Sequence, residues 1–138
     1  MAEKKLFSAR AGIQTSIFID NRPGSLASVI DLLGEHKINM TALALSEGLE
    51  IGYLRIIVDN PARARTVLHG KGHLVIERDV VLLEVANEPG GMAAAVDKLA
   101  RAGVNVEYAY SGNSLSNTHS VIIVRVNDVR AALKVLAG

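Results

Sequence analysis

The alternation of apolar and polar residues predicts a strand followed by a helix, and the chain contains this pair twice. Residues 13–20 alternate in polarity and are rich in β-branched side chains, as a half-buried strand is. Residues 25–37 carry apolar side chains at helical spacing, which predicts one amphipathic helix. The same two patterns return in residues 80–86 and 90–102. The chain therefore reads as a repeat of one structural unit.

Further elements complete the first half of the chain. We expect strands at residues 40–45 and 51–58, with a polar turn at residues 46–48 between them. Asn60 is suited to cap a helix that Pro61 opens. This helix ends at a glycine pair, after which a fourth strand follows.

That fourth strand is predicted at residues 73–77, separate from the strand that begins at residue 80. Either Asn21 or Ser25 can cap the first helix. Before the first strand, Ala11-Gly12 reads as a break, so residues 1–12 form a leader.

The second half repeats these elements. Strands are expected at residues 105–111 and 118–126, with a turn at residues 112–117 between them. Asn127 or Asp128 then caps a last helix.

Two similar turns mark the repeat most clearly. Asn21-Arg22-Pro23-Gly24-Ser25-Leu26 lies between the first strand and helix, and Asn87-Glu88-Pro89-Gly90-Gly91-Met92 stands at the same place, shifted from position 21 to position 87. The residues around both turns match at the same shift, which indicates an internal duplication.

Each half thus has the order β-α-β-β-α-β, which predicts an α+β protein of two ferredoxin-like units. In each unit an antiparallel sheet carries both helices on one face. We place the units at residues 13–78 and 79–138. Because Gly138 aligns with Gly70, the second unit lacks its own final strand. We expect residues 5–10 of the leader to form a short strand at that vacant sheet edge, in the same chain or in a partner, because exposed edges are normally covered.

The duplicated Asn-x-Pro-Gly turn, followed by a helix that ends in Ile38-Asn39 or Val104-Asn105, resembles the ACT domain. The whole chain is similar to a stand-alone tandem ACT protein. This resemblance implies a non-enzymatic regulatory module that binds a free amino acid between ACT units.

The turns have the chemistry that such binding needs. A turn that enters a helix presents unpaired backbone N–H groups and the positive end of the helix dipole, which together can hold a carboxylate. Gly24 and the Gly90-Gly91 pair lack the Cβ that would keep a ligand away from the backbone. Gly91 makes the second turn the favoured one. The alternative is that each Pro-Gly merely makes a tight turn and each Asn merely caps a helix.

Two tyrosines distinguish the halves. Tyr108 and Tyr110 share one face of a strand, where the first half has Ala42 and Ala44. They either line a ligand pocket or pack in a sheet interface. The candidate ligand-binding residues are Asn21, Pro23, Gly24, Ser25, Leu26, Asn87, Pro89, Gly90, Gly91, Met92, Tyr108 and Tyr110.

Other kinds of site are not expected. His69 and His73 are spaced as on one helix turn, but glycines interrupt that helix, so neither a metal site nor any cofactor is predicted. No group of residues has the members that acyl, phosphoryl or hydride transfer requires. An RNA-binding sheet would need aromatic residues on its two central strands and a basic face, which this sequence does not supply.

Composition sets the remaining expectations. Basic and acidic residues number 15 and 14 and the net charge is +1, so we expect neither nucleic acid nor a membrane surface as a partner. No apolar run reaches the roughly 18 residues of a spanning helix, and no signal peptide is evident, so we expect a cytoplasmic protein.

The hydrophobic content of 49% is high for so short a chain. Apolar or aromatic residues fall on the sheet face away from the predicted helices, which favours a homodimer. They are Tyr53, Ile57, Val121 and Ile123.

The sequence therefore predicts a sensor of a free amino acid or similar ligand. The alternative is an interaction module that binds nothing small and assembles with a metabolic enzyme.

Overall fold

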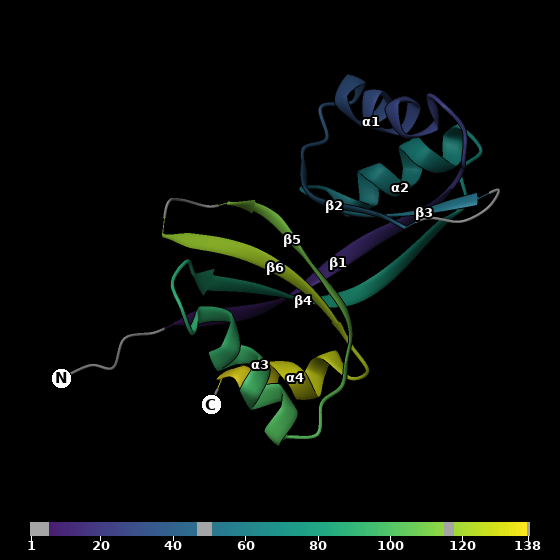
Figure 1. Ribbon diagram of the computed structural model, residues 1–138. Helices are drawn as coiled ribbons and strands as arrows, with labels where there is room; N and C mark the ends of the chain where they lie inside the picture. Colours follow the sequence, from purple (N-terminus) through teal and green to yellow (C-terminus); the bar gives the residue numbers. More distant parts are fainter. Residues whose placement is uncertain (1–5, 47–50, 115–117, 138) are drawn as a thin grey trace. The chain divides into compact units, whose positions relative to one another are not determined.

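The computed structural model describes residues 6–46, 51–114 and 118–137 (Figure 1). This part of the chain holds six strands and four helices, and the strands pair in antiparallel fashion within each unit. The chain divides into two compact units: Ile13–Arg78, called the first unit, and Asp79–Gly138 with Met1–Gly12, called the second unit. The predicted α+β class, with two ferredoxin-like units, is confirmed.

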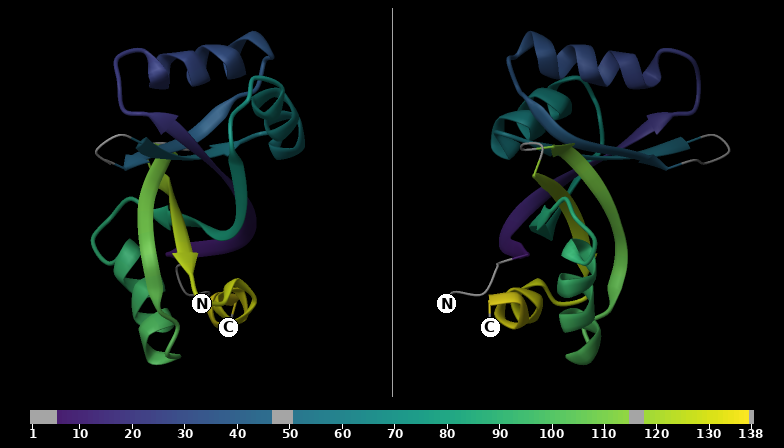
Figure 2. Two further views of the ribbon diagram at one scale, coloured as in Figure 1. Left: turned by 90° about the vertical axis from the view of Figure 1, so that its right-hand side faces the viewer. Right: turned by 60° about the vertical axis from the view of Figure 1, so that its left-hand side comes forward.

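The first unit contains most of β1 and the elements up to the start of β4. In its sheet β3 pairs with both β1 and β2, and the N–H of Phe18 donates to the carbonyl of Leu74, the residue before β4, at 3.4 Å. Both helices lie on one face of this sheet (Figure 2). The elements are β1 (Phe7–Asp20), α1 (Ser25–Glu35), β2 (Met40–Ser46), β3 (Ile51–Val58), α2 (Pro61–Gly70) and β4 (Val75–Ala86).

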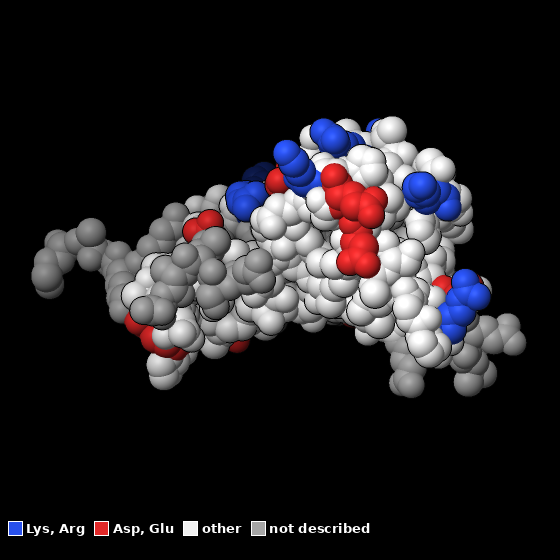
Figure 3. Space-filling view, turned by 90° about the horizontal axis from the view of Figure 1, so that it is seen from above, with Lys and Arg blue, Asp and Glu red and all other residues white. Residues whose placement is uncertain are grey.

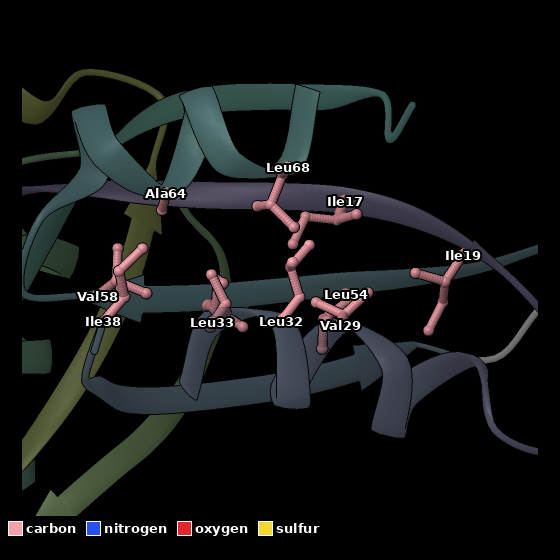
Figure 4. Packing of buried hydrophobic residues seen from close by; sticks show 11 residues of the cluster. Ile17, Ile19, Val29, Leu32, Leu33, Ile38, Leu54, Val58, Ala64 and Leu68 are labelled. Carbon is pink, nitrogen blue, oxygen red and sulfur yellow. The ribbon is translucent and has the colours of Figure 1, made fainter. Parts of the chain in front are cut away.

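An aliphatic core joins the helices of the first unit to its sheet (Figure 4). Helix α1 supplies Val29 and Leu33, while α2 supplies Leu68, at the helical spacing that the sequence showed. Ile17 and Leu54 reach this core from neighbouring strands, and neither is exposed. The core fixes which face of the sheet meets the helices.

The second unit repeats the arrangement. Strand β6 pairs with β4 and β5, and a second aliphatic core lies between this sheet and its helices. Its elements, besides parts of β1 and β4, are α3 (Gly91–Arg101), β5 (Val106–Ser114), β6 (His119–Val126) and α4 (Val129–Ala137).

The N-terminal end of β1 lies in the second unit. The N–H of Ala86 donates to the carbonyl of Leu6 at 2.8 Å, and Phe7 packs against the second core. The predicted break at Ala11-Gly12 is wrong, because β1 runs through it without interruption. A Cβ on Gly12 would lie 2.6 Å from the Leu82 Cδ1, so this glycine makes room for a side chain and does not form a turn.

The fourth strand is also longer than predicted. Residues 73–77 and 80–86 were expected as separate strands, but β4 runs from Val75 to Ala86 without interruption. The intervening Arg78 and Asp79 are charged and exposed, and they stay in the extended conformation because neither residue breaks a strand.

Two of the predicted helix caps are present. The side chain of Asn60 accepts a hydrogen bond from the Arg63 N–H at 3.1 Å, and that of Asp128 accepts one from the Ala131 N–H at 3.0 Å. Asn127, the other candidate cap of α4, accepts instead from the N–H of Asn105 at 3.2 Å.

The cap predicted for α1 is wrong. Gly24 holds the cap position with φ of 89°, so neither Asn21 nor Ser25 is the cap residue. The turns predicted at residues 46–48 and 112–117 lie partly outside the described residues, which exclude 47–50 and 115–117. Within the described part, Gly112 to Ser114 belong to β5 and not to a turn. No helix in the described part is long and apolar enough to cross a membrane.

Candidate functional site

The first turn joins β1 to α1 and leaves the start of the helix open. The N–H of Arg22 donates to the Asp20 carbonyl at 3.0 Å, and the N–H of Ser28 donates to the Gly24 carbonyl at 2.9 Å. The cap residue Gly24 has no side chain, and the N–H of Ser25 donates to the Arg22 carbonyl at 3.3 Å. The N–H groups of Leu26 and Ala27 are therefore the ones left without a partner inside the helix, at the positive end of its dipole. This end of the helix suits an anionic group.

The second turn, between β4 and α3, has the same backbone. Gly90 holds φ of 88°, the N–H of Glu88 donates to the Ala86 carbonyl at 2.9 Å, and the N–H of Ala94 donates to the Gly90 carbonyl at 3.0 Å. The repeat therefore extends to individual hydrogen bonds.

The sequence suggested that Gly91 leaves space for a ligand beside the backbone, and the structure does not show such a space. A Cβ at this position would lie 2.2 Å from the carbonyl oxygen of Ala86, and Gly91 is buried. The space that the missing side chain leaves is filled by the protein's own backbone. The reason for favouring the second turn as the ligand turn is therefore wrong.

A small cavity adjoins the first turn. Its volume is about 190 Å³, below the roughly 300–1,000 Å³ of pockets that hold drug-sized molecules. The ends of β1 and β2, the start of β3 and the first turn of α1 form its wall. The lining residues are Ile19, Asp20, Asn21, Arg22, Ser25, Leu26, Leu45, Ser46 and Gly52.

A wider groove of about 670 Å³ also borders this turn. It shares Ile19, Asp20, Arg22 and Ser25 with the small cavity. Its lining also includes Lys71 and His73, from the connection between α2 and β4. The turn thus borders two hollows of different size.

Charge at the first turn is paired and exposed. Arg22 Nη2 lies 3.4 Å from Asp20 Oδ2, and their side chains are 73% and 65% exposed. Such a pair contributes little to stability, so both groups are available to a ligand. On the face shown in Figure 3, basic and acidic side chains are interspersed and no extended patch of one sign forms.

Comparison with known proteins shows the family. The model of the ACT domain pair matches residues 11–137. The chain is an ACT domain pair. ACT pairs are regulatory domains, and the match includes no catalytic domain.

Solved structures agree with this fold. The ACT pair is 32% identical to protein BT0572 from Bacteroides thetaiotaomicron, with a TM-score of 0.86 over 94% of this chain and 88% of that one. The regulatory subunits of aspartate kinase from Thermus thermophilus (in its ligand-free form) and Thermus flavus share the fold, at 20% and 18% identity and TM-scores of 0.69 and 0.61. Each comparison covers 97% of both chains. No curated protein matches the chain significantly.

The two tyrosines of the ACT pair share one face of β5, as the sequence indicated. Their rings are nearly parallel, at 18°, with centroids 6.4 Å apart. Ala109, between them, pairs with Val124 of the second core, whereas Tyr110 pairs with Ile123. Tyr108 and Tyr110 therefore lie on the sheet face away from α3 and α4.

This position separates the tyrosines from the second turn. Tyr110 is level with Ile123, which pairs with Leu82, four residues before Ala86 at the end of β4. Four residues of strand span about 13 Å. The structure does not bring the tyrosines and the second turn together on one face.

Burial changes the argument for a homodimer of the ACT pair. Ile57 and Ile123, both assigned from the sequence to a surface for a partner, are only 7% and 0% exposed within one chain. Their apolar character therefore does not require a second copy. The homodimer itself stays a prediction.

The sequence missed six of the residues that line the small cavity, among them Ile19 at the end of β1. Asp20 precedes the motif and Arg22 lies within it, and their charge was the signal available for them. Leu45, Ser46 and Gly52 come from β2 and β3, and only the strand register, in which Ile19 pairs with Gly52, brings them to the turn.

Proposed function

We propose that this ACT pair is a regulatory sensor that binds a free amino acid at the first turn. The observation that carries the proposal is the small cavity beside the uncapped start of α1. Its lining includes Asp20 and Arg22, whose charged groups lie 3.4 Å apart and are together called the charged mouth. A zwitterionic head group requires partners of both charges in this way.

Each charge has a role in this proposal. The α-carboxylate would accept hydrogen bonds from the N–H groups of Leu26 and Ala27 and from the Arg22 guanidinium. The α-ammonium would donate to the carboxylate of Asp20 and to the side-chain oxygen of Asn21. Opening the ion pair between Arg22 and Asp20 would cost little, because both side chains are exposed.

The second turn offers a weaker match. At the positions of Asp20 and Arg22 it has Ala86 and Glu88, so an uncharged residue replaces the acidic one and an acidic residue replaces the basic one. Asn87, Pro89, Gly90, Gly91 and Met92 repeat the backbone of the first turn without its charges. We therefore place the amino acid at the first turn.

Screening the twenty amino acids by thermal shift at millimolar concentration tests the proposal. A ligand at about 100 times its Kd adds about 2.7 kcal/mol to the free energy of unfolding, which raises the Tm measurably. We expect at least one amino acid to do so. If none does, the alternative function, an interaction module that assembles with a metabolic enzyme, replaces this one.

Variants locate the site. Arg22→Ala and Asp20→Asn should each weaken binding of a hit about tenfold or more in calorimetry, because each removes a charge-assisted hydrogen bond. The matched control is Glu88→Ala, the same position in the second turn, which should leave the Kd unchanged. A loss in the control variant with none in the other two would move the site to the second turn.

A further inference from the structure

One end of the small cavity at the first turn is apolar. Ile19, Leu26 and Leu45 line it from β1, α1 and β2, and Gly52 of β3 lies among them. A Cβ on Gly52 would lie 3.4 Å from the Leu45 Cδ1 and 3.5 Å from the Ile19 Cγ1. The missing side chain of Gly52 therefore leaves space bordered by two aliphatic side chains.

Leu45 is unusually exposed for a residue in this place. It pairs with Leu54, which is fully buried in the first core, yet Leu45 itself is 47% exposed. Covering such a side chain with an apolar group is favourable, because apolar surface leaves water. The cavity thus holds uncovered apolar surface next to its charged mouth.

The equivalent place in the second unit is more polar, although Val85 and Met92 there match Ile19 and Leu26. Ser111 pairs with Ile122 as Leu45 pairs with Leu54, and Ser120 pairs with Val85 as Gly52 pairs with Ile19. The repeat therefore has Leu45 and Gly52 replaced by serines in the second unit, and keeps them only at the turn that also carries the charge pair.

We infer that the first turn selects an amino acid with an uncharged aliphatic side chain, with Gly52 setting the size limit and Leu45 covering the bound side chain. This inference rests on the proposed function, since the charged mouth must hold the head group. A charged side chain at the apolar end would lose its hydration without gaining a partner.

Calorimetry with a graded set of amino acids tests the ligand class. The probes are glycine, alanine, valine, isoleucine and leucine, with aspartate, lysine and phenylalanine as competitors of other chemistry. We expect an aliphatic member to bind tightest, with on the order of a tenfold gain for each methylene group that fits. Tightest binding by aspartate, lysine or phenylalanine would overturn the inference while leaving the proposed function in place. No binding by any amino acid would overturn both.

Two variants test the residues. Gly52→Ala should weaken the largest aliphatic ligand about tenfold and leave glycine and alanine nearly unchanged, because the new methyl group occupies the space of the ligand side chain. Leu45→Ser, which copies the second unit, should reduce the difference between aliphatic and small ligands.

The matched controls are Ser120→Ala and Ser111→Ala, which alter the corresponding positions of the second unit and should keep the same order of affinities. All four variants are compared by Tm first, and a Cβ at position 52 meets only ordinary contacts, so the fold should be retained. An unchanged order of affinities in both Gly52→Ala and Leu45→Ser would remove these residues from selection.

Discussion

Three glycines show how differently one residue type is used along this chain. Gly24 and Gly90 hold φ of 89° and 88°, where a side chain strains the backbone although open space surrounds it. Gly91 has the opposite constraint, since its backbone is ordinary but the carbonyl of Ala86 occupies the space of a Cβ. The same short motif therefore contains two separate physical requirements.

This difference predicts a graded effect of alanine. Gly91→Ala should lower the free energy of unfolding by about 2–3 kcal/mol, because the backbone must move to relieve the overlap with Ala86. Gly24→Ala should cost about 1 kcal/mol, from strain alone. Urea denaturation measures both values.

Gly34 provides the matched control. It lies within α1 with open space around it, so Gly34→Ala should stabilise the protein by about 0.5–1 kcal/mol. Equal losses at Gly24 and Gly91 would show that the contact with Ala86 imposes no constraint.

The sequence could not predict which of these glycines leaves space for a ligand and which makes room for the protein's own backbone. The repeat marked Gly24 and Gly91 as special, but the same absence of a side chain suits either a ligand or the protein's own carbonyl. Only the placement of Ala86, at the end of a neighbouring strand, separates the two uses.

The four helices begin in two different ways. Asn60 and Asp128 cap α2 and α4 through their side chains, whereas α1 and α3 begin at left-handed glycines without a side-chain cap. In both helices that follow the candidate turns, the first N–H donates to a carbonyl of the turn itself, from Ser25 to Arg22 and from Gly91 to Glu88.

Removing the side-chain caps should cost stability. Asn60→Ala and Asp128→Ala should each lower the free energy of unfolding by about 1 kcal/mol, because each leaves an N–H at the helix start without its partner. Thr66→Ala is the control within α2, since its hydroxyl only donates back to the Ala62 carbonyl. A cap variant as stable as this control would contradict the assignment.

Element boundaries were predictable where a local signal exists. Asn60-Pro61 and Asp128 are such signals, and both caps are confirmed. The lengths of β1 and β4 were not predictable, because Gly12 looks like a breaker unless the position of Leu82 is known.

The whole chain has a second unit that is not continuous in sequence. Residues 1–12 belong with residues 79–138, and Phe7 and Ala9 pack against the second core. The duplication revealed the missing final strand of the second unit, and with it the fold class. The cavity at the first turn could not be foreseen, because it depends on the register of three strands.

Disrupting the N-terminal strand should therefore act on the second unit. Phe7→Asp should lower the Tm and reduce the free energy of unfolding by about 2 kcal/mol, because a charge replaces an apolar side chain at the second core. Arg10→Asp, at an exposed position of the same strand, is the control and should have little effect.

Deleting residues 1–10 extends this test. We expect a lower Tm or a changed mass in light scattering, because the sheet edge beside Ala86 would be left open. If the protein that lacks residues 1–10 keeps the Tm and the oligomer mass of the full chain, this strand is dispensable.

The hydrogen bond between Ala86 and Leu6 joins residues 80 positions apart, from 6 to 86. During synthesis β1 leaves the ribosome before the rest of the ACT pair, but its place in the second sheet exists only after β4, β5 and β6 have been made. At roughly 5–20 residues per second, the strand waits several seconds for it. The first unit, continuous from Ile13 to Arg78, can fold in that interval, so the protein is built from its middle outward.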